Sequence, residues 1–246
     1  MLLQFSLNEI EKKYGTAASV AVFFAIMILF TVILITLVMF AGRAAHRRRK
    51  IKRAAWGRKY GLELQDTLEM GKRLFAHLDT EVGEKVLADY PYVSLFRTNT
   101  TARAMYILEG TVDGRQTRVF EYQYITGSGR TTVEHRHTVV AVEFDGIKGY
   151  TALRRHGWGD KLSKDDIKTG VEVFDKEFYI YADEWGLLRN EMPQELAQML
   201  MDSILKDLVL AEKRLVIVAT GRVKDDDYDK LLADGRRLGE WIGSKY

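Results

Sequence analysis

The sequence predicts an α+β protein with one N-terminal transmembrane helix, followed by a curved, mainly antiparallel sheet with helices. Three observations predict this class: an uncharged stretch of 26 residues from Ala17 to Gly42, alternating apolar runs from Ala102 onward, and helical periodicity near the C-terminus. A helix that crosses the hydrocarbon core needs about 20 apolar residues, so the uncharged stretch is long enough to span a bilayer. Strands first and helices later are typical of an α+β domain.

The uncharged stretch divides the chain into four regions. The residues after it, Arg43 to Arg49, form a stop-transfer pattern and not the small-residue cleavage site of a signal peptide. Two Lys or Arg precede the span and nine follow it, which predicts an exported N-terminus and a cytoplasmic C-terminal domain in a bacterial inner membrane. The predicted regions are an exported tail (1–16), a transmembrane helix (17–42), a basic juxtamembrane segment (43–59) and a cytoplasmic α+β domain (60–246).

Basic residues are concentrated directly after the span. The segment 43–59 holds nine Lys or Arg and no acid, whereas the domain from Tyr60 onward holds 26 basic and 32 acidic residues. The formal charge of +3 therefore comes from one segment, which argues against nucleic acid as a partner. Such clusters attract anionic lipid headgroups, although fixing the topology also requires positive charge there. The predicted lipid contacts are Arg47, Arg48, Arg49, Lys50, Lys52 and Arg53.

Small residues recur on one face of the predicted span. Ala17, Ala21 and Ala25 lie four residues apart, a spacing that lets a second helix approach closely. This pattern predicts a membrane-protein partner; the alternative is that alanine is simply common in membrane helices. The chain has no cysteine, so thiolate zinc sites, iron–sulfur clusters and cysteine nucleophiles are excluded.

The domain is expected to begin with a helix over Leu62 to Leu78 and to continue with two hairpins. Asp113-Gly114 is a strong hairpin signal because a type I′ turn needs positive φ at both central residues. The hairpins are predicted from three strands, namely Ala102 to Val112, Arg115 to Thr126 and Thr131 to Asp145.

The second half of the domain shows a mixture of strand and helix patterns. Two helices are indicated, one by a proline in the first turn and an apolar stripe, and one by acids in its first turn. The expected elements are strands over Thr151 to Arg155 and Val171 to Tyr181, the latter broken at Asp175, a helix over Pro193 to Lys206, a hairpin over Leu208 to Thr220 folded at Glu212-Lys213, and a helix over Asp225 to Trp241. A curved sheet closed by this last helix would be analogous to a pleckstrin-homology-like roll.

Several runs of this sequence resemble an uncharacterised family of bacterial membrane-anchored proteins. They are Leu108 to Arg115, Val119 to Arg130 with its phenylalanine-acid-tyrosine-x-tyrosine strand and T-G-S-G-basic turn, and His135 to Val139. The resemblance covers about Trp56 to Trp241 and departs at Leu153-Arg154-Arg155, where the family has an arginine-proline-glutamate. The resemblance implies an anchored cytoplasmic domain, and it adds no activity because the family has no assigned catalytic or binding residues.

Two features of the central hairpin invite a chemical interpretation. The turn Gly127 to Arg130 could cradle an anion with its backbone amides, but it joins two strands and lacks the G-K-[ST] ending, which favours a plain turn. His135 and His137 project from one face of a strand and could share a metal with His156, but no carboxylate completes the set.

The register of that hairpin decides between a metal site and a packed cluster. If Gly127 to Arg130 is a four-residue turn, Thr126 pairs with Thr131, so Tyr122 lies opposite His135 and Phe120 opposite His137. In the same register Glu121 lies opposite Arg136. Cross-strand aromatic pairs stabilise sheets, which favours an aromatic–histidine cluster over a metal site.

The remaining candidate chemistry is weak. Asp225 to Asp227 with Asp229 lack the loop spacing of a hard-cation cage and are better explained as a helix N-terminus. No G-x-S-x-G, H-E-x-x-H or P-loop motif occurs. The sequence therefore predicts no enzyme, cofactor or metal, but an interaction module that is an accessory or structural subunit of a membrane complex. The alternatives are a sensor of anionic lipid or of a small ligand and, less favoured, an unrecognised hydrolase.

Overall fold

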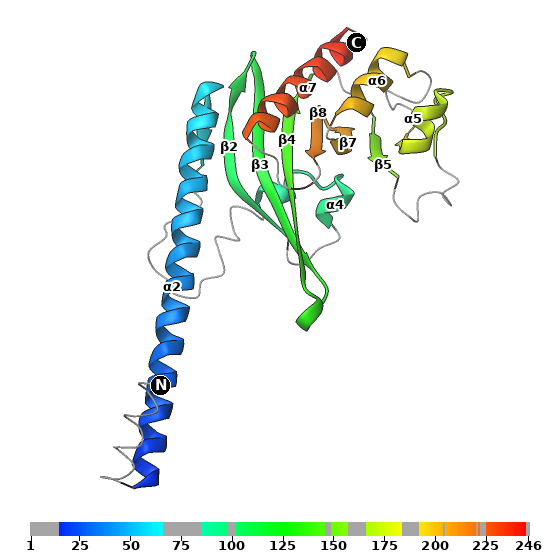
Figure 1. Ribbon diagram of the computed structural model, residues 1–246. Helices are drawn as coiled ribbons and strands as arrows, with labels where there is room; N and C mark the ends of the chain where they lie inside the picture. Colours follow the sequence, from blue (N-terminus) through cyan, green and yellow to red (C-terminus); the bar gives the residue numbers. More distant parts are fainter. Residues whose placement is uncertain are drawn as a thin grey trace. The chain divides into compact units, whose positions relative to one another are not determined.

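The computed structural model describes most of the chain as two compact units, residues 1–52 and residues 53–246. Helix α2 (Thr16–Lys59) begins in the first unit, and its last residues belong to the second (Figure 1). The residues that the structure describes are 15–65, 85–97, 102–145, 149–156, 166–183, 192–203, 205–219, 221 and 225–244.

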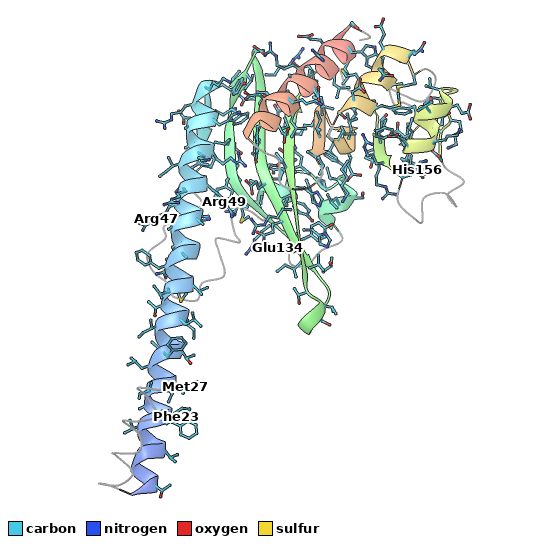
Figure 2. The ribbon with its side chains drawn as sticks, in the orientation of Figure 1. Phe23, Met27, Arg47, Arg49, Glu134 and His156 are labelled. Atoms are coloured by element: carbon cyan, nitrogen blue, oxygen red, sulfur yellow. The ribbon has the colours of Figure 1, made fainter. Side chains whose placement is uncertain are left out.

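The first unit contains the apolar part of α2. The described residues include one helix long and apolar enough to cross a membrane, as the sequence predicts. The side chains of Phe23 and Met27 project outward from this part of the helix (Figure 2). Thr31 and Thr36 donate their hydroxyls to the carbonyls four residues earlier, at 2.8 Å each. Such bonds satisfy a hydroxyl where no water is available.

The second unit is built on an eight-stranded antiparallel sheet, which confirms the predicted α+β class. The strand order is β1-β2-β3-β4-β8-β7-β5-β6, so among the described strands the sheet is open and does not close into a roll. The strands are β1 (Leu62–Leu64), β2 (Arg103–Val112), β3 (Arg115–Thr126), β4 (Val133–Glu143), β5 (Thr151–Arg155), β6 (Phe178–Ala182), β7 (Leu205–Ala211) and β8 (Arg214–Ala219).

Two of the predicted hairpin turns are confirmed. Asp113 and Gly114 have φ values of 51° and 77°, and they join β2 to β3. Glu212 and Lys213 have φ values of 48° and 63°, and they join β7 to β8. Positive φ at both central residues matches the right-handed twist of the flanking strands.

Two predicted elements were wrong. Leu62–Leu64 is a strand and not the start of a helix, because it pairs with the edge of β2; the rest of that predicted helix, up to residue 78, lies largely outside the described residues. Residues 171–181 are not one broken strand but helix α5 (Glu172–Glu177) followed by β6. The Asp175 carboxylate accepts bonds from the backbone N–H groups of Thr169 and Gly170, which folds the chain back before the strand begins.

The sheet separates two hydrophobic cores. One face packs against α5, α6 (Gln194–Asp202) and α7 (Asp225–Gly243), and α7 crosses the sheet in Figure 1. The other face is covered by residues 85–97, which include α4 (Ser94–Arg97). Both predicted C-terminal helices are present, and α6 is shorter than expected because the chain enters β7 at Leu205.

Candidate functional site

The end of α2 is joined to the sheet by a buried ion pair. Arg53 and Glu121 are 7% and 4% exposed, and both Nε and Nη2 of Arg53 lie 3.2 Å from Glu121 Oε1. The Arg53 guanidinium also lies 3.8 Å from the ring centroid of Tyr228 on α7. The Tyr228 hydroxyl reaches the same Glu121 oxygen at 3.4 Å, and burial raises the pKa of Tyr228. The charge of Glu121 is thus compensated from two helices.

A second cluster surrounds Asp229 on α7. Trp56 Nε1 and the Tyr60 hydroxyl each donate to Asp229 Oδ1 at 2.7 Å, and Lys59 Nζ lies 3.1 Å from Oδ2. These donors, Trp56 first, lower the pKa of the Asp229 carboxyl. Trp56 therefore packs against the domain, where its ring also contacts Tyr60 and Tyr228. The acidic start of α7 serves as a helix terminus, as predicted, and Asp229 binds side chains of α2 and the turn that follows it.

The predicted lipid contacts fall into two groups. The prediction that Arg53 contacts lipid was wrong, because this residue lies in the domain interior, paired with Glu121. Arg47, Arg48 and Lys52 are exposed, whereas Arg49 and Lys50 are half-buried (Arg47 and Arg49 are labelled in Figure 2). Lipid contact by these five residues stays a prediction.

The predicted helix-packing alanines lie on α2. Ala21 and Ala25 are exposed, and the side chain of Ala17 lies outside the described residues. Exposed alanines at this spacing remain compatible with a second helix, which stays a prediction.

The central hairpin has a register shifted by two residues from the prediction. Thr126 pairs with Val133, so Tyr124 lies opposite His135 and Tyr122 opposite His137. The cause is a six-residue connection, residues 127–132, that contains the short 3₁₀ turn η1 (Gly129–Thr131). The connection needs glycine at position 127, where φ is +84° and a Cβ would meet the carbonyl of residue 131. A shift of two residues preserves the faces, so the tyrosines and histidines still share one side of the sheet.

The shift changes two other pairings. Phe120 lies opposite Val139 and not His137, and Glu121 lies opposite Thr138 and not Arg136. Arg136 instead donates to Glu134, which lies toward the hairpin end of β4 (Figure 2). Glu121 is therefore available to Arg53.

The two strand histidines pack against tyrosines, as predicted. The His135 ring stacks on Tyr124 at 4.6 Å between centroids, and His137 stacks on Tyr122 and Tyr124 at 6.2 and 5.7 Å. Burial, with Lys206 and His135 nearby, lowers the pKa of His137 to about 4, so its ring is neutral near pH 7. His156 lies elsewhere, with Nε2 3.3 Å from the Asp175 carbonyl. Among the described residues no group of three His, Cys, Asp or Glu is placed to hold a metal ion.

A cavity of about 200 Å³ lies on the sheet face opposite α7. Its polar side chains include Arg154 and the buried Asp207, which lie opposite each other on β5 and β7. The Arg154 guanidinium lies 5.7 Å from the ring centroid of Tyr179. The lining residues are Val93, Ser94, Leu95, Tyr150, Ala152, Leu153, Arg154, Tyr179, Tyr181, Asp207 and Val209. Sequence analysis missed this site because its residues come from four separate segments.

Other arginines serve the fold. Arg118 Nη1 lies 2.6 Å from Asp89 Oδ2, and Arg214 Nη1 donates to the Asp89 carbonyl at 2.7 Å. Both hold residues 85–97 against the sheet. Arg155, in the triplet that departs from the family pattern, donates to the carbonyls of Met201, Ser203 and Leu205 and so fixes the turn between α6 and β7.

A second cavity, of about 570 Å³, lies between α6 and α7. Asp234 is 7% exposed, and its Oδ2 has no hydrogen-bond partner. Burial raises the pKa of this carboxyl, and Lys230 and Arg237 on the same helix oppose that shift. The lining residues are Gln194, Glu195, Gln198, Met199, Asp202, Lys230, Asp234 and Arg237.

Comparison with known proteins gives one structural likeness. No protein-family model and no curated protein sequence matches the chain. The crystal structure of the mycobacterial trehalose monomycolate transport factor A, TtfA, is similar, with a TM-score of 0.53 and 12% sequence identity. The alignment covers 78% of this chain and 92% of that one. At this identity the likeness shows a shared α+β fold.

Proposed function

We propose that this chain is a membrane-anchored interaction module and an accessory subunit of a larger membrane complex. In this proposal the apolar part of α2 crosses a bacterial inner membrane, with the N-terminus outside and the sheet domain in the cytoplasm. The excess of nine Lys or Arg after the span against two before it supports this orientation. The proposal assigns the chain no reaction of its own.

The observation that carries the proposal is the end of α2. The helix continues from the apolar stretch to Lys59 without interruption, and its last residues are partnered with the sheet and with α7. A flexible linker would leave a domain free to search for diffusing substrates. The last turns of α2 instead belong to the domain, and they follow directly on the predicted membrane span in the sequence.

The structural likeness to TtfA supports the proposal that the complex is one for membrane transport. The neighbouring fold belongs to a protein named as a transport factor for trehalose monomycolate. We therefore place this chain beside a membrane transporter, as a protein that binds and positions and does not itself transport.

Purification of the full chain in a mild detergent, followed by mass spectrometry, tests the proposal. We expect one set of membrane proteins at a constant ratio to the chain, and loss of that set when Ala21 is replaced by leucine. The matched control is Ala41→Leu, which lies on the same helix at the far end of the predicted span, 16 residues after Ala25. If the chain is isolated alone from gently solubilised membranes, the proposal is wrong.

The tyrosine-lined cavity favours a second candidate, the binding of a small polar ligand. A concave site with an apolar floor and a few convergent polar groups is typical of ligand pockets. Asp207 and Arg154 supply an acceptor and a fork of donors, and Tyr179 supplies a ring face. Thermal unfolding of the full chain with hexoses, amino acids and their phosphates tests this role. A stabilising ligand should lose its effect in Tyr179→Ala, and a panel without any stabilising compound would count against a sensor.

A further inference from the structure

The groove between α6 and α7 contains a buried acid that lacks a complete set of partners. Asp234 lines this groove, is more than nine-tenths buried, and has an Oδ2 without a hydrogen-bond partner. Buried polar groups in folded proteins nearly always have partners, and an unsatisfied one reduces stability. A partner group from outside the chain would satisfy this oxygen.

The other charged groups of the groove show which side chains are already engaged. Lys230 donates to the Asp202 carbonyl at 2.9 Å, and the Asp202 carboxylate accepts two bonds from Gln198 at 3.1 Å each. Lys230 and Asp202 therefore contribute to holding α6 against α7. Asp234 differs from Asp202 because its Oδ2 is buried and has no hydrogen-bond partner among the described residues.

The groove has the size and composition of a contact surface for a polypeptide. Its volume of about 570 Å³ exceeds the 200 Å³ of the tyrosine-lined cavity, and Met199 contributes an apolar side chain. Three acids, Glu195, Asp202 and Asp234, face two bases, so the groove is negative on balance. A negative groove with an unsatisfied carboxylate oxygen complements a cationic donor.

We propose that the α6–α7 groove is a docking site for a partner protein, and that a lysine or arginine of this partner binds Asp234. This inference rests on the proposed function and specifies the surface used. Burial of Asp234 is compatible with binding, because a charge-assisted hydrogen bond is stronger in a desolvated site. Arg237, which lines the same groove three residues further along α7, provides a place for an acidic neighbour of the bound base.

Site-specific photo-crosslinking in the full chain, in its native membrane, tests the site. Benzoylphenylalanine replaces Gln194, an exposed residue of the groove, and in a control it replaces Tyr181 on the outer strand β6. We expect a discrete product from position 194 and none from position 181. Mass spectrometry should locate the crosslink within one helical turn of a lysine or arginine in the partner.

A charge-matched pair of variants tests the role of Asp234. Asp234→Asn keeps the shape and removes the acceptor charge, and we expect roughly a tenfold loss of the product. Asp202→Asn removes the same charge from the same groove, at a carboxylate that Gln198 already satisfies, and should leave most of the product. Equal yields from Asp234→Asn and the parent, or equal losses in the two variants, would overturn the site.

The outcomes also separate this inference from the proposed function. Partner proteins that co-purify but crosslink at position 181 and not at position 194 would refute the groove and leave the accessory role intact. Absence of any co-purifying protein would refute both.

Discussion

Two buried acids of the domain, Glu121 and Asp234, are treated differently by their surroundings. Glu121 is 4% exposed and receives two bonds from Arg53 and one from Tyr228, whereas Asp234 is 7% exposed and has an oxygen without a partner. Both acids are associated with α7: Glu121 accepts a bond from Tyr228 of this helix, and Asp234 is one of its residues. The fully paired acid lies where the chain joins its own elements, and the incompletely paired acid lies in an open groove.

This difference in hydrogen bonding indicates a different role for each buried acid. A buried ion pair usually contributes little net stability against an apolar substitute, but it strongly disfavours arrangements in which either partner is left alone. Glu121 thus selects the position of Arg53 on the sheet. Oδ2 of Asp234 has no hydrogen-bond partner among the described residues, which is the reason we assign it to an external partner.

The largest expected effect comes from breaking the Arg53–Glu121 pair. Arg53→Met leaves Glu121 buried without its cation and should lower the free energy of unfolding by about 3–5 kcal/mol. The double variant Arg53→Met with Glu121→Leu removes both charges and should recover most of the loss. Urea unfolding of the full chain in detergent, monitored by tryptophan fluorescence, measures both. Strictly additive losses in the double variant would contradict the paired description.

A third buried group, His137, sharpens the comparison because it is neutral near pH 7, although its Nε2 also has no hydrogen-bond partner in the described part of the chain. Its pKa in the folded protein is about 4, below the value of about 6.5 for an unfolded chain. Between these values the unfolded state binds more protons, so stability is complete above about pH 6.5 and declines as the pH falls toward 4. The expected decline is on the order of 3 kcal/mol.

His137→Phe keeps a stacked ring and removes the titration. The variant should lose less stability than the parent between pH 7 and pH 4.5 in the same urea measurement. The comparison must be made as a difference between the two proteins, because carboxylates elsewhere also titrate in this range. Parallel pH profiles would show that His137 is not the group responsible.

The sequence could predict these features only where the determining contacts are local. Asp113-Gly114 and Glu212-Lys213 fix their hairpins by backbone conformation alone, and the alternating pattern placed the tyrosines and histidines on one face. The register was missed because the 3₁₀ turn lengthens the connection by two residues, which no pattern in residues 127–132 signals. Strand β1 was missed because three residues pair with a strand more than forty positions away.

The candidate sites were harder to predict for the same reason. Arg53 and Glu121 are 68 residues apart, and the sequence pattern predicted that Arg53 is one of the lipid contacts of a basic segment. One signal was present: Glu121 is an acid that stands between Phe120 and Tyr122 in a predicted strand. An acid at such a position requires a cation, but the sequence does not identify which one.

A smaller effect is expected at Asp234, with the opposite sign to that at Arg53. Burial raises the pKa of this acid in the folded state, so the charged form is disfavoured there and stability is reduced above the pKa of the unfolded carboxyl, about 3.9. Asp234→Asn should therefore raise the free energy of unfolding of the isolated chain by about 1 kcal/mol at pH 7. The gain should vanish near pH 3. A variant that is less stable at pH 7 would show that Asp234 has a partner within the chain.

The smallest effect is expected at Asp229, an acid with three donors but with a side chain that is 41% exposed. Water can replace a lost donor at such a site, so Trp56→Phe should cost only about 0.5 kcal/mol, far less than Arg53→Met. Because the donors lower the pKa of Asp229, the stability they provide is present above the unfolded value and is lost as the pH falls below it. The difference between Trp56→Phe and the parent should therefore shrink on acidification, as measured by the change in near-UV circular dichroism on unfolding. Asp229→Asn should behave similarly, since an amide oxygen still accepts from Tyr60. A loss as large as that from Arg53→Met would show that the exposure of an acid does not determine how much its donors contribute to stability.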